Sequence, residues 1–260
     1  MKQQTAQIQK SVQKKIAKPV QKQVQPVQQF KPSSSGKAII FDSGTLISFS
    51  MNGVTDLIRK LKGIFKGKFL ITQDIKREVI DTPLKIKRFE LEALKIKALL
   101  DEGIIEMPSS IGMNDSEISS KAQEIMNTAN KMFASSNRDV HLLDVGECSC
   151  LALSKMLTEK GIQNVLAVDE RTTRMLSENH EGLRNFLQKK LHTKIKINEE
   201  SVKLFQGFRF LRSTELAYVA YKKGLVPLKN GNVLDALLYA MKFKGAAISG
   251  EEIQQIERLG

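Results

Sequence analysis

Short, continuous apolar runs alternate along the chain with stretches in which apolar residues recur at helical spacing. The runs 38–41, 69–71 and 165–168 contain only hydrophobic residues, as expected for strands that are buried on both faces of a parallel sheet. The segment 193–197 is interpreted as an edge strand. Strands that alternate with helices predict an α/β fold in which helices cover both faces of a central parallel sheet.

Capping signals help to place the helices. Thr72 is expected to be an N-cap, Gly103 to end a helix, and Ser249 to form a capping box with Glu252. By residue number, the expected helices are 54–65, 72–80, 83–100, 144–157, a helix that begins at 170, 213–223, 232–243 and 249–258. The last three follow the final strand and are predicted to form a group of C-terminal helices.

Composition divides the chain into three regions. Residues 1–36 are rich in Gln and Lys and cannot bury enough apolar surface to offset their ordering entropy, so we expect a disordered basic tail. Residues 37–200 carry the alternation of strands and helices and are expected to form the main domain. Within it, the polar segment 113–138 is interpreted as an insertion with one helical stretch, marked by Ile118, Ala122, Ile125 and Ala129. Residues 201–260 are interpreted as a helical extension.

The net charge favours a polyanionic partner. The chain has 41 basic and 28 acidic residues, a formal charge of +13, and residues 1–37 hold eight lysines without an acid. Nucleic acid is the commonest partner of this kind, although a solubilising tail explains the tail charge equally well. The tail lysines expected to contact it are Lys10, Lys14, Lys15 and Lys18. No apolar stretch is long enough to span a membrane, and two cysteines make no disulfide framework, which predicts a cytosolic protein.

Three acids occupy similar places in the pattern. Asp42 and Asp169 directly follow two of the predicted strands, and Glu147 lies at the start of a helix. In an open α/β sheet the site lies outside the carboxyl ends of the strands, so these acids are expected to converge. Converging carboxylates favour a hard cation, Mg²⁺ or Mn²⁺. Taken alone, Asp42 or Asp169 is better explained as a turn or N-cap residue, and Glu147 could be a first-turn acid that complements the helix dipole. Only the set of three, in this order, favours a site.

These motifs resemble those of the PIN-domain nucleases. The run IIFDSGTLI contains Asp42, LDVGECSCLAL contains Glu147, and LAVDERTTR contains Asp169. Glu78, in IKREVI, matches the family acid that follows the second strand. The resemblance covers about residues 38–179. It implies a Rossmann-like three-layer α/β/α fold with a central parallel sheet, to which this chain adds C-terminal helices.

The resemblance also implies an activity, the metal-dependent hydrolysis of RNA phosphodiester bonds in RNA processing or in a toxin-like role. Asp42, Glu147 and Asp169 would hold Mg²⁺ or Mn²⁺ directly, and Glu78 would act nearby or through water. Four further residues would support the site: Ser43, Thr45, Asp144 and Glu170. Arg171 and Arg174 would contact flanking phosphates, unless they are only solvated surface arginines.

Some features depart from the family pattern. Glu147 stands where many members have Asp, Gly44 replaces a larger polar residue, and Asp144 is either an extra ligand or a helix N-cap. A PIN-like module without catalysis that binds RNA or a protein, and a structure-specific DNA nuclease, remain alternatives. A homodimer or a protein partner also stays open.

Other sites are excluded by their missing residues. Gly44 stands where a haloacid-dehalogenase phosphatase needs a second Asp, and the chain has no Gly-rich phosphate loop. Cys148 and Cys150 have no neighbouring His, which argues against zinc.

Overall fold

The computed structural model describes residues 36–135, 138–139, 142–229 and 231–259. These residues belong to one compact unit built on a sheet of four parallel strands in the order β2-β1-β5-β7. The strands are β1 (Lys37–Phe41), β2 (Lys68–Leu70), β5 (Gln163–Ala167) and β7 (Phe210–Leu211). The prediction of an α/β fold with a central parallel sheet flanked by helices is therefore confirmed.

Burial of the apolar runs explains why these segments form the sheet. Every residue of β1 after Lys37 is buried, and Phe69 and Leu70 of β2 are also fully enclosed. β1 pairs in parallel register with β2 on one side and with β5 on the other. β7 was not predicted, because two residues are too short to show a periodic pattern.

The direction in which the chain crosses the sheet creates a crevice. From β1 the chain goes to β2 on one side and later returns to β5 on the opposite side of β1. Adjacent parallel strands whose connections leave in opposite directions define a topological switch point, where ligand sites form beyond the carboxyl ends. Asp42 and Asp169 follow the two strands at this point.

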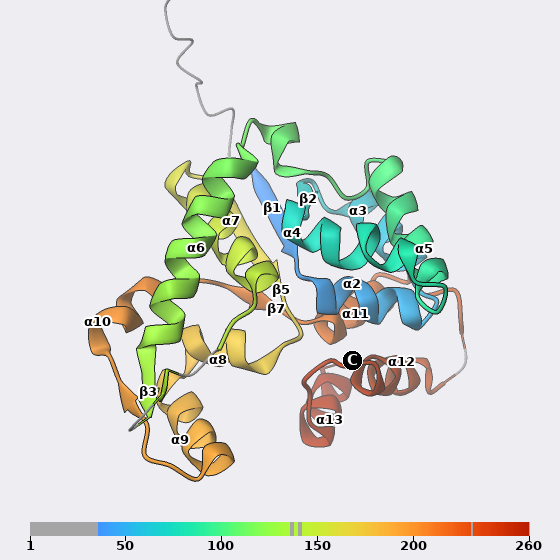
Figure 1. The fold of residues 1–260 in the computed structure, drawn as a ribbon. Helices are drawn as coiled ribbons and strands as arrows, with labels where there is room; N and C mark the ends of the chain where they lie inside the picture. Colours follow the sequence, from blue (N-terminus) through green and yellow to red (C-terminus); the bar gives the residue numbers. More distant parts are fainter. Residues whose placement is uncertain (1–35, 136–137, 140–141, 230, 260) are drawn as a thin grey trace, which may run out of the picture. The chain divides into compact units, whose positions relative to one another are not determined.

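Helices cover the sheet on both sides. They are α2 (Ser43–Met51), α3 (Asp56–Ile64), α4 (Gln73–Lys76), α5 (Glu90–Asp101), α6 (Asp115–Met132), α7 (Val145–Glu159), α8 (Arg171–Glu178), α9 (His180–Leu191), α10 (Glu199–Val202), α11 (Ser213–Lys222), α12 (Val233–Phe243) and α13 (Gly250–Arg258). Short turns add η2, a π-helix (Arg77–Asp81), and three 3₁₀ helices, η3 (Pro83–Lys85), η4 (Pro108–Ile111) and η5 (Lys203–Phe205). Figure 1 shows α6 and α7 on one side of the central strands and α3 and α11 on the other.

The structure confirms the three predicted capping signals. Thr72 accepts a hydrogen bond from the Ile75 NH at 3.3 Å, Gly103 adopts a positive φ of 68°, and Ser249 and Glu252 form the predicted capping box. The continuous helix expected over 83–100 is wrong. A 3₁₀ turn ends at Lys85, Ile86 is extended, and α5 begins only at Glu90. The intervening residues 86–89 (IKRF) contain two adjacent cations, and the apolar side chains of Ile86 and Phe89 are exposed, so packing does not hold them in a helix.

The polar segment 113–138 contains α6, whose predicted helical stretch is confirmed. Its apolar residues Ile118, Ala122, Ile125 and Ala129 are buried in the core, and α6 packs along α7. Its end leads into a small antiparallel sheet, in which β3 (Phe133–Ser135) lies between β4 (Arg138–Asp139) and β6 (Lys196–Ile197). The expected edge strand at 193–197 thus pairs with this second sheet rather than with the central one.

The C-terminal segment is continuous with the main domain. It supplies β7 to the central sheet, and three helices then follow close to the predicted ranges. No helix in the described part of the chain has the length and apolar character needed to cross a membrane.

Candidate functional site

Asp42 connects the end of β1 to the start of α2. Its backbone NH donates to the Ala167 carbonyl at 3.0 Å, which extends the pairing of β1 with β5. Its side chain caps α2: Oδ2 accepts from the Gly44 NH at 3.4 Å, whereas Oδ1 is buried without a hydrogen-bond partner. Burial raises the pKa of Asp42 from 3.8 to about 7, and the negative charges of Glu147 and Glu78 add to this rise.

Glu147 lies in the first turn of α7 and ties it to α8. Its Oε2 accepts from the backbone NH of the N-cap Asp144 at 2.8 Å, and its Oε1 accepts from the Thr173 hydroxyl at 2.6 Å. Burial raises the pKa of Glu147 from 4.5 to about 7, although both hydrogen bonds oppose the shift. Of the two roles left open for Asp144, the structure shows the N-cap. Each oxygen of Glu147 retains a second lone pair for another ligand.

Asp169 lies one residue beyond β5 and faces the start of α11. Its Oδ1 accepts from the Ser213 NH at 2.7 Å, whereas its Oδ2 is buried without a hydrogen-bond partner. Burial raises the pKa of Asp169, and the hydrogen bonding with Ser213 and the charges of Arg174 and Arg212 oppose this rise. β7 and the start of α11 therefore position an acid that precedes them by about 40 residues.

Glu78 reaches the same region from the π-helical turn η2. Such turns are rare and occur frequently at functional sites. Gly146 permits the close approach, because a Cβ at that position would come within 2.9 Å of Glu78 Oε2. A 2.6 Å hydrogen bond between the Thr72 and Ser149 hydroxyls holds α4, which leads into this turn, against α7.

The structure brings the four predicted catalytic acids together around one cavity of about 260 Å³. Three of the four predicted supporting residues line it as well, and so does a glycine that the sequence did not indicate. The lining residues are Asp42, Ser43, Gly44, Glu78, Asp144, Glu147, Asp169, Glu170 and Gly245. A cavity of this composition is strongly acidic and accommodates a small cation with its water ligands.

The donor set fits an oxygen-preferring cation. Within the described ranges, no three or more His, Cys, Asp or Glu side chains are arranged as a ready-made metal cage. Asp42 Oδ1 and Asp169 Oδ2 are nevertheless buried acceptors without partners, which is costly unless another group neutralises or binds them. Mg²⁺ commonly takes only one or two carboxylates and keeps water in its remaining positions. Two unpartnered oxygens at one cavity satisfy that requirement.

The fourth predicted supporting residue, Thr45, lies beside the cavity lining rather than in it. Thr45 is fully buried, and its hydroxyl donates to the Ala167 carbonyl at 3.0 Å. It therefore joins α2 to the end of β5, instead of bonding to Asp42. Glu170 is the N-cap of α8 and accepts from the Thr173 NH at 2.7 Å.

The arginines predicted to contact RNA are outside the cavity lining. Arg174 is half-buried and donates to the Ala247 carbonyl at 3.2 Å, and burial lowers the pKa of its guanidinium. Arg171 is exposed, and its guanidinium lies 5.7 Å from the ring centroid of Phe186. The predicted tail contacts lie outside the described residues; they are Lys10, Lys14, Lys15 and Lys18.

Three residues of the site were missed in the sequence. Thr173 binds Glu147, the Ser213 NH binds Asp169, and Gly245 lines the cavity. Gly245 adopts a φ of 118°, and its neighbour Ala247 donates its NH to the Asp169 carbonyl at 3.3 Å. The sequence could have indicated Thr173, because it follows Asp169 within the same motif. Ser213 and Gly245 come from distant segments of the chain.

Comparison of the chain with protein-family models, curated proteins and solved structures gives no match. Membership of the PIN-domain family therefore stays a prediction from the motifs.

Proposed function

We propose that the chain is a metal-dependent endoribonuclease of the PIN type, which hydrolyses RNA phosphodiester bonds at the cavity beyond β1 and β5. One observation carries the proposal: Asp42 and Asp169 each present a buried oxygen without a partner at the topological switch point of the sheet. The basic composition of the chain adds support for a polyanionic substrate.

In this proposal the chain's residues have distinct tasks. Asp42 and Asp169 hold Mg²⁺ or Mn²⁺ through their free oxygens, and Glu147 contributes a lone pair that Thr173 and Asp144 leave unused. When bound, the cation supplies a water-derived nucleophile near neutral pH and stabilises charge on the phosphate. Glu78 is exposed at the cavity and orients water by hydrogen bonding.

The hydrogen bonds around the acids support this assignment. Each acid has one oxygen fixed by a backbone NH, from Gly44, Asp144 or Ser213. Backbone donors hold a carboxylate in place without adding a counter-charge that would compete with a cation. The acids are therefore oriented in advance, which is what a catalytic constellation requires.

The direct test is incubation of the purified chain with labelled structured RNA, single-stranded RNA and single-stranded DNA. Parallel reactions contain Mn²⁺, Mg²⁺ or EDTA. Cleavage of RNA that requires the cation and is lost in Asp42→Asn supports the proposal. Cleavage that persists in EDTA would contradict it, and preferential cleavage of DNA would replace the proposed substrate.

A second candidate has one observation in its favour. Because the described residues contain no ready-made three-residue metal cage, a PIN-like module that binds RNA without cutting it is the alternative. It predicts RNA binding that is equal in EDTA and in Mn²⁺, with no cleavage in either.

A further inference from the structure

The end of α12 carries an exposed aromatic ring, two residues before a glycine that lines the acidic cavity. Phe243 is the last residue of α12 and is 78% exposed, more than any other large hydrophobic side chain among the described residues. Only Lys244 separates it from Gly245, which lines the cavity. Single exposed apolar side chains are common on protein surfaces, so the groups around Phe243 decide whether it has a role.

Phe243 is not alone. Its ring lies 6.0 Å from that of Tyr239, one helical turn earlier, with the two planes at 34°. The ammonium of Lys242 lies 5.5 Å from the Tyr239 ring centroid. Tyr239 is partly buried against the core, and its hydroxyl lies close to Gly250 at the start of α13, so Phe243 is the exposed member of the two. We call Tyr239 and Phe243 the α12 aromatic pair.

The local charge favours an anionic ligand. Between Asp235 and Glu251 the chain has no acidic residue and has two lysines, Lys242 and Lys244, on either side of Phe243. An exposed ring flanked by cations is the combination that binds single-stranded nucleic acid, because bases stack on the ring while lysines attract phosphates.

We propose that the α12 aromatic pair binds an unpaired RNA base, next to the phosphate that occupies the acidic cavity. The inference rests on the proposed function and narrows its substrate to single-stranded RNA. A base within a duplex is stacked on both faces and cannot offer one to Phe243. The lysines also offset the repulsion between the substrate and the acids of the cavity.

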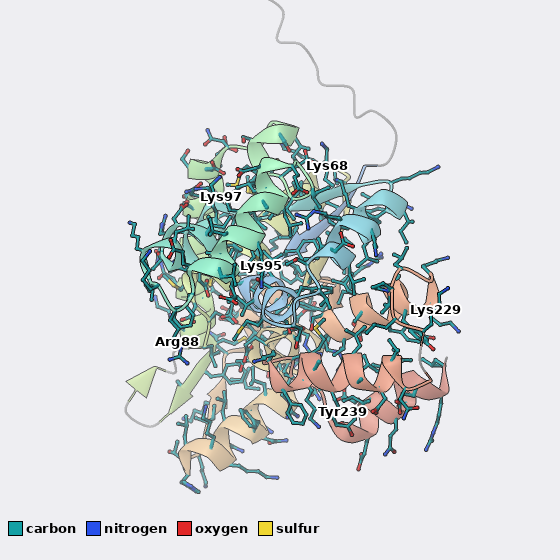
Figure 2. All side chains as sticks on the ribbon, turned by 90° about the vertical axis from the view of Figure 1, so that its right-hand side faces the viewer. Lys68, Arg88, Lys95, Lys97, Lys229 and Tyr239 are labelled. Atoms are coloured by element: carbon teal, nitrogen blue, oxygen red, sulfur yellow. The ribbon has the colours of Figure 1, made fainter. Side chains whose placement is uncertain are left out.

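The test uses three variants of the full chain. Phe243→Ala removes the ring, and Phe243→Trp keeps a ring and adds a fluorophore to a chain without tryptophan. Phe89→Ala is the matched control: Phe89 is 42% exposed and lies 5.5 Å from the Arg88 guanidinium, so it is also an exposed ring beside a cation. Figure 2 shows Arg88 far from Tyr239.

Binding of fluorescein-labelled oligouridylate and of an RNA duplex is measured in the Asp42→Asn background, which prevents cutting. We expect Phe243→Ala to weaken binding of the single strand roughly 5- to 100-fold, with little effect on the duplex. Phe89→Ala should leave both unchanged. Single-stranded RNA should also quench the fluorescence of Phe243→Trp, and an abasic strand should not.

Three outcomes separate the possibilities. Equal affinity of Phe243→Ala and the parent for the single strand overturns the inference. So does a change in the oligomeric state of Phe243→Ala with unaltered RNA binding, because the pair would then be a protein interface. If the stacking response appears but no variant with an intact Asp42 cleaves RNA, the inference stands and the proposed nuclease activity fails.

Discussion

Carboxylates in two parts of this molecule have opposite surroundings. Glu106, beside the end of β2, accepts hydrogen bonds from the ammonium groups of Lys62 and Lys68. Burial alone would raise the pKa of Glu106, but the two lysines outweigh it and the pKa is lowered. At the cavity, the pKa values of Asp42 and Glu147 are instead raised to about 7.

Glu106 and the cavity acids differ in whether cationic side chains are paired with their carboxylates. Arg212, whose charge opposes the raised pKa of Asp169, already donates to Glu215 and Glu252. Arg174 donates from Nη2 to the Ala247 carbonyl, its Nε is buried without a hydrogen-bond partner, and its charge also opposes the raised pKa of Asp169. The chain has an excess of cations, yet the cavity acids keep unneutralised oxygens, whereas Glu106 does not. A group of acids left in this state is a candidate functional site, because perturbed pKa values concentrate where function requires them.

The largest effect should come from neutralising a cavity acid. Asp42→Asn should lower RNA cleavage by roughly a thousandfold or more, because loss of a metal ligand removes several kcal/mol of transition-state stabilisation. The fold should survive, since Asn is as good an N-cap as Asp and can still accept from Gly44. Cleavage is followed with labelled RNA in Mn²⁺, and folding by circular dichroism.

The matched control for this loss is Glu106→Gln. It neutralises a carboxylate that is paired with Lys62 and Lys68 and has no assigned role in catalysis. Its cleavage rate should equal that of the parent. A comparable loss in both variants would show that the effect of Asp42→Asn is only structural.

A second expectation concerns the stability of the chain in EDTA as a function of pH. The folded-state pKa values of Asp42 and Glu147 lie above the ordinary values of 3.8 and 4.5, so the folded chain holds these protons more tightly. Their contribution to stability is complete below about pH 4 and is lost as the pH rises through about 7, by on the order of a few kcal/mol.

Urea unfolding at a series of pH values measures this contribution. In Asp42→Asn the decline towards neutral pH should be smaller, because one of the two titrating groups is gone. A parent and a variant with parallel stability profiles would contradict the raised pKa of Asp42.

A third expectation is that a cation reverses the loss. At a concentration a hundredfold above its Kd, Mn²⁺ should stabilise the parent by about 2.7 kcal/mol, through binding to the folded state alone. The double variant Glu147→Gln/Asp169→Asn should lose this gain while keeping its hydrogen bonds from Asp144 and Ser213. Equal increases in Tm for both proteins would place the ion elsewhere.

Much of the central sheet and of the acid site could be predicted from local sequence patterns. The strands β1, β2 and β5 could be recognised because residues buried on both faces of a sheet form continuous apolar runs. Position after such a strand then identified Asp42 and Asp169, and helix capping identified the place of Glu147. These features depend on residues close together in the chain.

The remainder depends on contacts between distant segments. No local pattern reports that Ser213 donates to Asp169 or that Gly245 closes the cavity, because these contacts form only when β7 and α12 are packed. The π-helical form of η2 is equally invisible, since it differs from an α-helix by one residue in its hydrogen-bond spacing. The motif resemblance implied that Thr45 supports the acid site, whereas its hydroxyl donates to the Ala167 carbonyl.

The smallest expected effect tests the other side of the comparison. Because the pKa of Glu106 is lowered, its contribution to stability is present above its ordinary pKa of 4.5 and is lost as the pH falls. Glu106→Gln should therefore destabilise the chain by about 1 kcal/mol near neutral pH and by less in acid. This is the opposite pH trend to that of Asp42→Asn, and urea unfolding of both variants in EDTA reveals it. If the two variants shared one pH trend, the cavity acids and Glu106 would not differ in their electrostatic surroundings as the hydrogen bonds of Lys62 and Lys68 indicate.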